Sequence, residues 1–483
     1  MKRDGRQGVG ASQHTDEAGE PTQRDPAEGG GRRDTELLER KMQETSNSDN
    51  VSTKLQRIAK LAEQDVTMAL VTLAHHIDVE FLKEAFRRTR KDGAPGVDGR
   101  TAAEYEEKLD ENLQSLLDRF KSGRYKAPPV RRAHIPKGDG TKTRPIGIPT
   151  IEDKILQRAV TMVLETAYEP IFSKSSYGFR PGRSARQASQ ALWTTLTRMG
   201  GGWVIEADIE SFFDTLDHHK LRKILDQRVR DGVLRRSIDK WLKAGVMEGA
   251  QRFFPRSGTP QGGVVSPLLA NVYLHTVLDE WFEKEMVPRL TAEAHLIRYA
   301  DDFVLVFREA QDAYLVFDQL AERFAEFGLK LHPDKTRLVH FRPPPWGPSG
   351  KDRLAPRSLD FLGFNYHWGR SRKGAWVVKQ KTARSRFTRT MHRISKWCRK
   401  NRHRPIDEQH AHLVRQLRGH DAYFGIRGNY RALEKLRYGV ARVWRQWLDR
   451  RSSKAHMNWD RFALLLKRYP LPRPRLYPVV ELA

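Results

Sequence analysis

Two adjacent carboxylates between two short, largely apolar runs constrain this chain most. Asp301 and Asp302 follow Tyr299 and Ala300, with residues 294–298 before them and residues 303–307 after them. Runs of this length around a tight polar segment predict two β-strands joined by a turn. Because like charges repel, such a pair serves either as a solvated turn or as ligands for a divalent cation. Taken alone, the tetrapeptide favours the solvated turn.

The charge balance predicts a polyanionic partner. Lys and Arg number 87 against 60 Asp and Glu, a net charge of +27 over 483 residues, and nucleic acid is the commonest partner for such a surface. An acidic membrane is the rival, but no apolar run approaches the roughly 18 residues of a spanning helix. The single cysteine, Cys398, excludes an internal disulfide framework and a Cys-pair zinc module. With no apolar secretory signal at the N-terminus, these features predict a reducing, cytosolic compartment and no membrane partner.

The length predicts two or three domains. Residues 1–50 have almost no apolar side chains and are predicted to be a disordered tail. Residues 51–378 alternate helical and strand patterns, which predicts an α/β region. Residues 379–483 are very basic with apolar residues at helical spacing, which predicts a separate all-α region; its tryptophans Trp444 and Trp447 are better explained as helical core than as base-stacking platforms.

Several local signals predict where elements begin and end. A Gly-Asp-Gly turn between apolar runs predicts a β-hairpin over residues 130–148, and residues 359–364 are expected to form a strand. Ser184 is predicted to cap a helix, and Ser266 is predicted to be the N-cap of another, with Pro267 at its first position. The hairpin tip carries Lys137, Lys142 and Arg144, which fits a phosphate-binding loop or a solvated basic turn.

A third carboxylate follows a predicted strand far from the first two. Asp208 comes directly after the apolar run 203–207. Phosphoryl transfer by two metal ions needs carboxylates from separate strands brought to one point, with the ions about 3.5–4 Å apart. Mg²⁺ prefers a few carboxylates plus phosphate oxygens, so three Asp residues suffice.

At this point the chain resembles a known family. Asp208 within residues 207–213, the loop 258–262 and residues 299–302 look like motifs A, B and C of reverse transcriptases, in the usual order and spacing. Lys335 resembles motif D and residues 359–364 resemble the primer-grip motif E. More narrowly, residues 144–150, 177–182, 417–425 and 461–474 are similar to bacterial group II intron-encoded proteins and their maturase domain. The resemblance covers roughly residues 79–366 and the C-terminal segment.

The resemblance implies a right-hand polymerase: α/β fingers and palm with an antiparallel palm sheet, followed by an α-helical thumb or maturase domain. It also implies roles for particular residues. Asp208, Asp301 and Asp302, with the backbone carbonyl of Ile209, would hold two Mg²⁺ ions, for which Mn²⁺ can substitute. Lys335 would protonate departing pyrophosphate. The nucleotide-binding residues would be Lys137, Arg144, Phe213, Gln261 and Gly262. Phe213 would exclude a 2′-hydroxyl, or be a core residue beside Phe212.

The implied activity is RNA-directed DNA synthesis, with dNTPs, an RNA template and a DNA primer or target as partners. The implied second role is binding the group II intron RNA to assist its splicing and later copying it during retrohoming. Basic helical residues are the RNA-binding candidates: Arg384, Arg386, Arg389, Arg393, Lys396, Arg418 and His420. The chain stops after the maturase segment, so no C-terminal HNH nuclease is expected. The sequence leaves the oligomeric state open.

Three alternatives remain at this level. A reverse transcriptase recruited to a retron, a diversity-generating element or a CRISPR system is disfavoured by the maturase-like segment. A splicing factor with a decayed polymerase site is disfavoured by the complete set of three Asp residues. An RNA-dependent RNA polymerase shares the palm geometry, but it usually has a small residue where Phe213 stands.

Overall fold

The computed structural model describes residues 50–137, 142–248, 251–253, 258–259, 262–344, 358–452 and 456–478. The predicted disordered tail, apart from Asn50, lies outside these residues, as do the hairpin tip and Gln261. The N-terminal part comprises a helix over residues 50–64, then η1 (Ala74–His76), α2 (Val79–Arg88), α3 (Ala102–Glu106), α4 (Leu109–Lys121), β1 (Val130–Lys137), β2 (Lys142–Ile148), α5 (Ile151–Tyr168) and α6 (Ala185–Arg198).

The middle of the chain alternates strands and helices. It comprises β3 (Gly202–Ala207), α7 (Phe212–Thr215), α8 (His218–Arg228), α9 (Gly232–Lys243), β4 (Val246–Glu248), β5 (Gln251–Phe253), α10 (Ser266–Leu274), the π-helix η2 (His275–Met286), η3 (Val287–Arg289), β6 (Ala294–Tyr299), β7 (Asp302–Phe307), α11 (Ala310–Glu326) and β8 (Arg337–Phe341).

The predicted hairpin is confirmed. Strands β1 and β2 pair antiparallel from Arg131↔Ile148 to Lys137↔Lys142, and the sheet order is β2-β1-β4-β5. Ser184 caps α6, as predicted, by accepting the Gln187 N–H. The prediction that Ser266 is an N-cap is wrong by one position. Ser266 is the first residue of α10 and Val265 stands at the cap, because Pro267 suits either the first or the second helical position.

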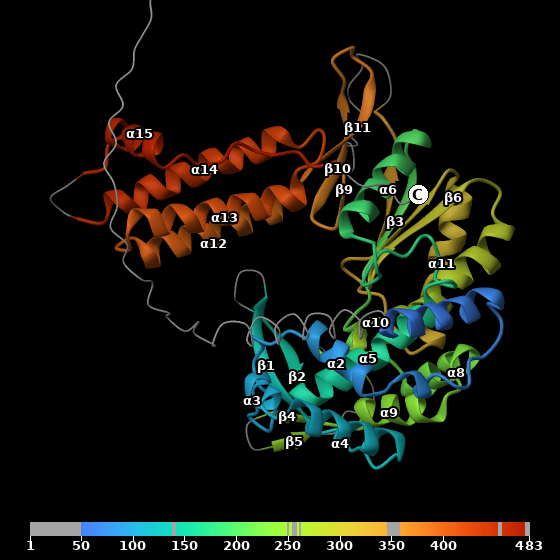
Figure 1. Cartoon of the computed structure of the whole chain (residues 1–483). Helices are drawn as coiled ribbons and strands as arrows, with labels where there is room; N and C mark the ends of the chain where they lie inside the picture. The colour runs from blue at the N-terminus through green and yellow to red at the C-terminus, as the bar shows by residue number, and fades with distance from the viewer. Residues whose placement is uncertain are drawn as a thin grey trace, which may run out of the picture. The chain divides into compact units, whose positions relative to one another are not determined.

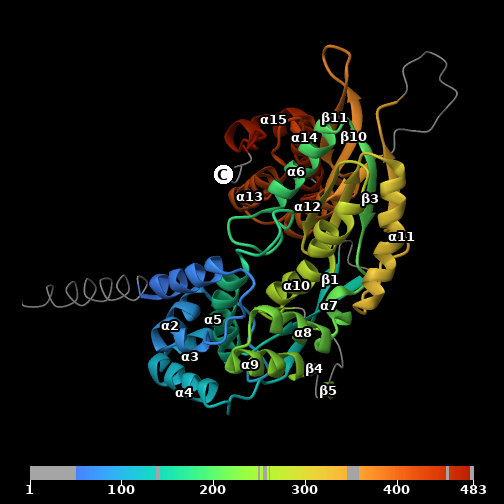
Figure 2. The same ribbon diagram turned by 90° about the vertical axis from the view of Figure 1, so that its right-hand side faces the viewer.

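The central sheet has the order β6-β7-β3-β8, and each neighbouring pair is antiparallel. Alternate residues point to opposite faces, so the sheet belongs to two cores. On β3, Ile205 joins the core formed with α10, η2 and α11, whereas Val204 joins the core formed with α6. Figure 2 shows α11 along one side of β3 and α6 on the other. Both faces are covered, and the strand ends are left as the place for polar chemistry.

A third sheet corrects two sequence predictions. Residues 359–364 form not one strand but β9 (Leu359–Phe361) and the start of β10 (Phe364–Arg370), because Leu362 and Gly363 turn the chain with φ of +49° and +82°. The prediction of helix from residue 379 is wrong for its first residues: β11 (Trp376–Thr382) pairs antiparallel with β10, and buried residues alternate along it. The basic side chains on its exposed positions hid that alternation.

The C-terminal region is helical. It contains α12 (Arg384–Asn401), α13 (Ile406–Phe424), α14 (Tyr430–Asp449) and α15 (Trp459–Arg468). Helices α12, α13 and α14 lie side by side (Figure 1) around their own apolar core, in which Trp444 is completely buried. Mixed α/β structure with antiparallel sheets followed by helices confirms the predicted fold class. Among the described residues, no helix is long and apolar enough to cross a membrane.

Candidate catalytic site

The Asp-Asp segment forms the predicted turn between β6 and β7. Tyr299 pairs with Asp302 at the end of the ladder, and Ala300 between them has φ of +57°. A left-handed backbone costs a non-glycine residue about 1 kcal/mol or more, so the surrounding structure has to impose it. The turn therefore projects Asp301 and Asp302 at one end of the central sheet.

The neighbouring strand brings the third carboxylate to the same end. The β3–β7 register runs from Trp203↔Phe307 to Ala207↔Phe303, so one further step sets Asp208 opposite Asp302. Directly opposed residues of an antiparallel pair point to the same face, with Cα atoms roughly 4.5–5.5 Å apart. The chain beyond β3 stays close to the sheet, since the His332 N–H donates to the Asp208 carbonyl over 2.8 Å.

Burial and the repulsion of neighbouring carboxylates raise the pKa values of Asp301 and Asp302. Burial is the main cause that raises the pKa of Asp302 to about 6, and the charges of Asp301 and Asp208 add to it. Burial also raises the pKa of Asp301. The negative charge of Asp208 raises it further, whereas the positive charges of Arg144 and Lys335 lower it. A cluster of carboxylates with raised pKa values is a site that gains from a cation.

One cation is already at hand within the chain. The Lys335 ammonium forms an ion pair with Asp208, and this lysine side chain is 58% exposed. Among the described residues, no group of three or more His, Cys, Asp or Glu side chains is arranged as a ready-made ion site. The strand register brings Asp208, Asp301 and Asp302 to one end of the central sheet, and Lys335 forms an ion pair with Asp208.

A fully buried ion pair supports the turn from below. Arg298 and Asp279, both 0% exposed, form two hydrogen bonds of 2.7 and 2.6 Å. Burial opposes the ionised form of Asp279, but the Arg298 guanidinium and the His275 side chain together outweigh it and lower the pKa of that carboxyl. Arg298 also donates to the carbonyl of Ala300 over 3.1 Å, which fixes the strained residue of the turn.

The same network reaches the loop of residues 177–182. The Asn271 side chain accepts from Arg298 over 2.9 Å and donates to the Gly178 carbonyl over 2.6 Å. A Cβ on Gly178 would lie 2.3 Å from the Ala300 nitrogen, so this loop packs directly against the turn. Sequence reasoning missed Arg298, Asp279 and Asn271; an arginine inside an otherwise apolar strand was the available signal.

The loop that precedes α10 meets the segment that follows Asp208. The Thr259 N–H donates to the Phe213 carbonyl over 2.7 Å, and the Gly258 N–H donates to the Leu216 carbonyl over 2.8 Å. Phe213 is half-buried and its ring centroid lies 5.4 Å from that of Phe212. The segment after Asp208 and the loop before α10 are thus joined through their backbones.

The remaining nucleotide candidates lie on or near β2. Arg144 is exposed, and its charge is among those that act on Asp301. Gly262, with φ of +111°, is so close to β2 that a Cβ there would lie 2.4 Å from the Gly147 carbonyl oxygen. The side chain of Lys137 and all of Gln261 lie outside the described residues. Ile209 is buried and forms an isolated bridge with Leu331, whose two hydrogen bonds use the Asp208 carbonyl and the Glu210 N–H.

A basic groove of about 630 Å³ begins at the turn that carries Asp301 and Asp302. Asp302, Tyr299 and Leu362 line one part of it, and residues of α12 and α13 line the rest, among them four RNA-binding candidates: Arg386, Arg389, Arg393 and His420. Burial lowers the pKa of His420 to about 4, so His420 is neutral near pH 7. The other candidates, Arg384, Lys396 and Arg418, are exposed on the same helices but do not line the groove.

Backbone strain gathers at this site. The non-glycine residues with positive φ among those described are Phe179, Ser211, Ala300 and Leu362. Each lies in one of the segments that the sequence singled out. Strained residues persist only where the surroundings impose them, and they cluster at functional sites.

Sequence comparison with known proteins identifies the family of this chain. Residues 135–366 match the family described as reverse transcriptase (RNA-dependent DNA polymerase). Protein YkfC of Escherichia coli is 35% identical over 324 residues, which cover 60% of this chain and 85% of YkfC. The group II intron-encoded protein LtrA of Lactococcus lactis is 38% identical over 252 residues, 50% of this chain. Nuclear intron maturase 4 of Arabidopsis thaliana is 28% identical over 140 residues, 29% of this chain and 17% of that protein.

The chain belongs to the reverse transcriptase family, in its group II intron-encoded branch. This confirms the resemblance, the right-hand polymerase fold and the enzyme class, RNA-directed DNA polymerase. Reverse transcriptases use divalent metal ions and bind nucleic acid. The matched segment spans only 41% of the length of LtrA.

Proposed function

We propose that this protein copies RNA into DNA with Asp208, Asp301 and Asp302 as the ligands of two Mg²⁺ ions, which Mn²⁺ can replace. The observation that carries the proposal is the strand register that sets Asp208 opposite Asp302, next to Asp301. When bound, the ions would activate the primer 3′-hydroxyl and stabilise the charge on the leaving pyrophosphate. The Ile209 carbonyl is a further candidate ligand.

The donor set fits hard divalent cations. Carboxylate and carbonyl oxygens are the ligands that Mg²⁺ prefers, and the raised pKa values of Asp301 and Asp302 indicate a surplus of negative charge. The Lys335–Asp208 ion pair has to open before Asp208 can act as a ligand. In this proposal the released ammonium of Lys335 protonates the departing pyrophosphate.

Residues around β2 would hold the incoming dNTP. Arg144 would bind its phosphates with a bidentate fork, together with Lys137. Gln261 and Gly262 would line the side of the pocket where the nucleotide meets the template base. Phe213 would lie against the deoxyribose and disfavour a 2′-hydroxyl; its backbone link to Thr259 supports a position beside that pocket.

The RNA partner would be a group II intron. The names of LtrA and the Arabidopsis intron maturase associate them with introns, and the basic groove of α12 and α13 supports RNA binding by this chain. We propose that the protein binds its intron RNA, assists splicing and then copies the RNA from a DNA primer during retrohoming. With these substrates, its place is the bacterial cytosol and nucleoid.

Primer extension on an RNA template tests the proposal. The wild-type protein should incorporate dNTPs in Mg²⁺ and discriminate against rNTPs, while Asp301→Ala should lose extension by at least about a hundredfold. Equal, weak extension by both proteins together with stimulated splicing would favour the splicing-factor alternative. Extension with rNTPs alone would favour an RNA polymerase.

A further inference from the structure

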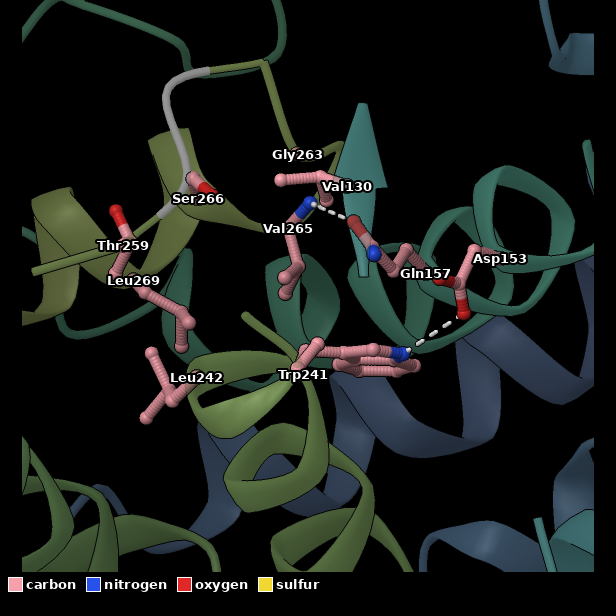
Figure 3. Close-up of a pocket in the computed structure, with 11 residues that line it drawn as sticks. Val130, Asp153, Gln157, Trp241, Leu242, Thr259, Gly263, Val265, Ser266 and Leu269 are labelled. Atoms are coloured by element: carbon pink, nitrogen blue, oxygen red, sulfur yellow. Dashed lines mark hydrogen bonds between the residues drawn. The ribbon is translucent and has the colours of Figure 1, made fainter. Parts of the chain in front are cut away.

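A buried glutamine of α5 holds the loop that leads into α10. Gln157 is 3% exposed and lies on the apolar side of its helix between Leu156 and Ala159. Its side-chain oxygen accepts the N–H of Val264 over 2.8 Å and the N–H of Val265 over 3.4 Å. Figure 3 shows this side chain pointing from α5 toward Val265. One amide oxygen therefore takes two consecutive backbone donors.

Those two donors need a partner because of where they lie. They directly precede Ser266, the first residue of α10, and the N-cap residue Val265 has no side chain that can accept a hydrogen bond. The first N–H groups of a helix and those just before it have no intrahelical acceptor. Gln157, more than one hundred residues away in sequence, provides the acceptor that a Ser or Asp cap usually supplies.

A second contact prevents α5 from shifting beneath the loop. Asp153, one helical turn before Gln157, accepts a hydrogen bond of 3.3 Å from the Trp241 indole of α9. The Tyr125 hydroxyl accepts from the same indole nitrogen over 3.1 Å. The cavity lined by Asp153, Gln157 and Trp241 among others measures only about 10 Å³ (Figure 3), so these side chains are closely packed.

The other end of the loop reaches the nucleotide side of the site. Gly262 touches β2 so closely that any side chain would collide with Gly147 and with the Ile146 side chain. β2 also carries Arg144. The hydrogen bonds from the loop backbone to Gln157 therefore help to fix the position of Gly262 against β2, the strand that would hold the triphosphate.

We propose that Gln157 is a positioning residue for nucleotide binding. Its side-chain oxygen holds the backbone of the loop 262–265 where this loop can line the pocket for an incoming dNTP. The inference rests on the proposed function, because it takes that loop as one wall of the dNTP pocket. In this proposal Gln157, which is buried, acts through the loop backbone and makes no contact with the nucleotide.

Single-nucleotide extension with three variants tests this role. Gln157→Met keeps the volume but removes the acceptor, so KM for dNTP should rise about five- to tenfold, with kcat within about twofold of the wild type. Gln157→Glu keeps an acceptor oxygen and should restore a KM close to the wild-type value. Thr161→Val is the matched control: Thr161 is equally buried one turn further along α5, and its hydroxyl has no hydrogen-bond partner among the described residues. Its KM should be unchanged.

A further variant keeps the test informative if Gln157→Met does not fold. Gln157→Asn keeps the amide but draws it back by one methylene, so it should also raise KM, even if Gln157→Met does not fold. A wild-type KM in either variant, or an equal rise in Thr161→Val, would overturn the inference. No dNTP incorporation by the wild-type protein would instead overturn the proposed function itself.

Discussion

The turn that carries Asp301 and Asp302 and the loop before α10 are supported in opposite ways. The turn rests on charge: Arg298 and Asp279, both fully buried, pair through two hydrogen bonds, and Arg298 also binds the Ala300 carbonyl. The loop rests on a neutral amide, Gln157, which accepts two backbone N–H groups. Both supports are buried, and both act on backbone rather than on the residues proposed to meet substrate.

This difference follows from what each segment has to carry. The turn contains the strained residue Ala300, so a buried guanidinium that donates to the Ala300 carbonyl keeps this backbone in place. The loop is proposed to face a nucleotide, and its support only has to accept two backbone N–H groups.

The largest stability effect should come from the charged support. Arg298→Met would leave the Asp279 carboxyl fully buried without its main partner, which costs about 3–5 kcal/mol. Chemical denaturation should therefore show a much lower free energy of unfolding. The double variant Arg298→Met with Asp279→Leu removes both charges and should recover part of the loss. If the single variant were as stable as the wild type, the turn would not depend on this pair.

The two close-packed glycines give an intermediate effect and compare the segments directly. Gly178→Ala would drive a methyl group into the backbone of Ala300, and Gly262→Ala would drive one into the Gly147 carbonyl at a φ of +111°. Each should destabilise the fold by about 1–3 kcal/mol. Gly178→Ala should mainly lower kcat, because it displaces the acids, while Gly262→Ala should mainly raise KM for dNTP.

Gly99→Ala is a control, since Gly99 also has positive φ, +69°, but no atom lies within 4 Å of its added Cβ. It should change stability through backbone strain alone and leave both kinetic constants near wild type. Similar kinetic changes in all three variants would break the distinction between turn and loop.

The sequence predicted the acids better than their supports. Asp208, Asp301 and Asp302 follow apolar strands, and a strand end next to a carboxylate is a local pattern that can be read without coordinates. The pairing of Arg298 with Asp279 joins a strand to a π-helical segment, and no local pattern encodes that contact. Gln157 interrupts an apolar helical stripe, which is a signal for a buried polar role, but its partners are set only by tertiary structure.

A pH effect is expected at Asp153. Burial raises the pKa of Asp153 to about 8, so this carboxyl stays protonated in the folded protein at neutral pH. Its pKa in the unfolded chain is near 3.8, the ordinary value. Between these values the folded state holds a proton that the unfolded state has lost, so stability falls as pH rises toward 8.

Asp153→Asn keeps an acceptor for the Trp241 indole but cannot ionise. Its melting temperature, compared with the wild type, should rise steadily from pH 5 to pH 8, equivalent to about 1.4 kcal/mol for each pH unit between the two pKa values. A difference that stays constant with pH would mean that Asp153 is ionised in the folded protein.

The most direct test of the central claim is the binding of Mn²⁺, followed by electron paramagnetic resonance, to the protein with primed RNA and a non-hydrolysable dNTP. The wild-type protein should bind two ions. Asp208→Asn should lose one of them and weaken the other at least about tenfold, because the three carboxylates converge on a shared site. Unchanged stoichiometry and affinity in Asp208→Asn would show that Asp208 stays with Lys335 and takes no part in a metal centre with Asp301 and Asp302.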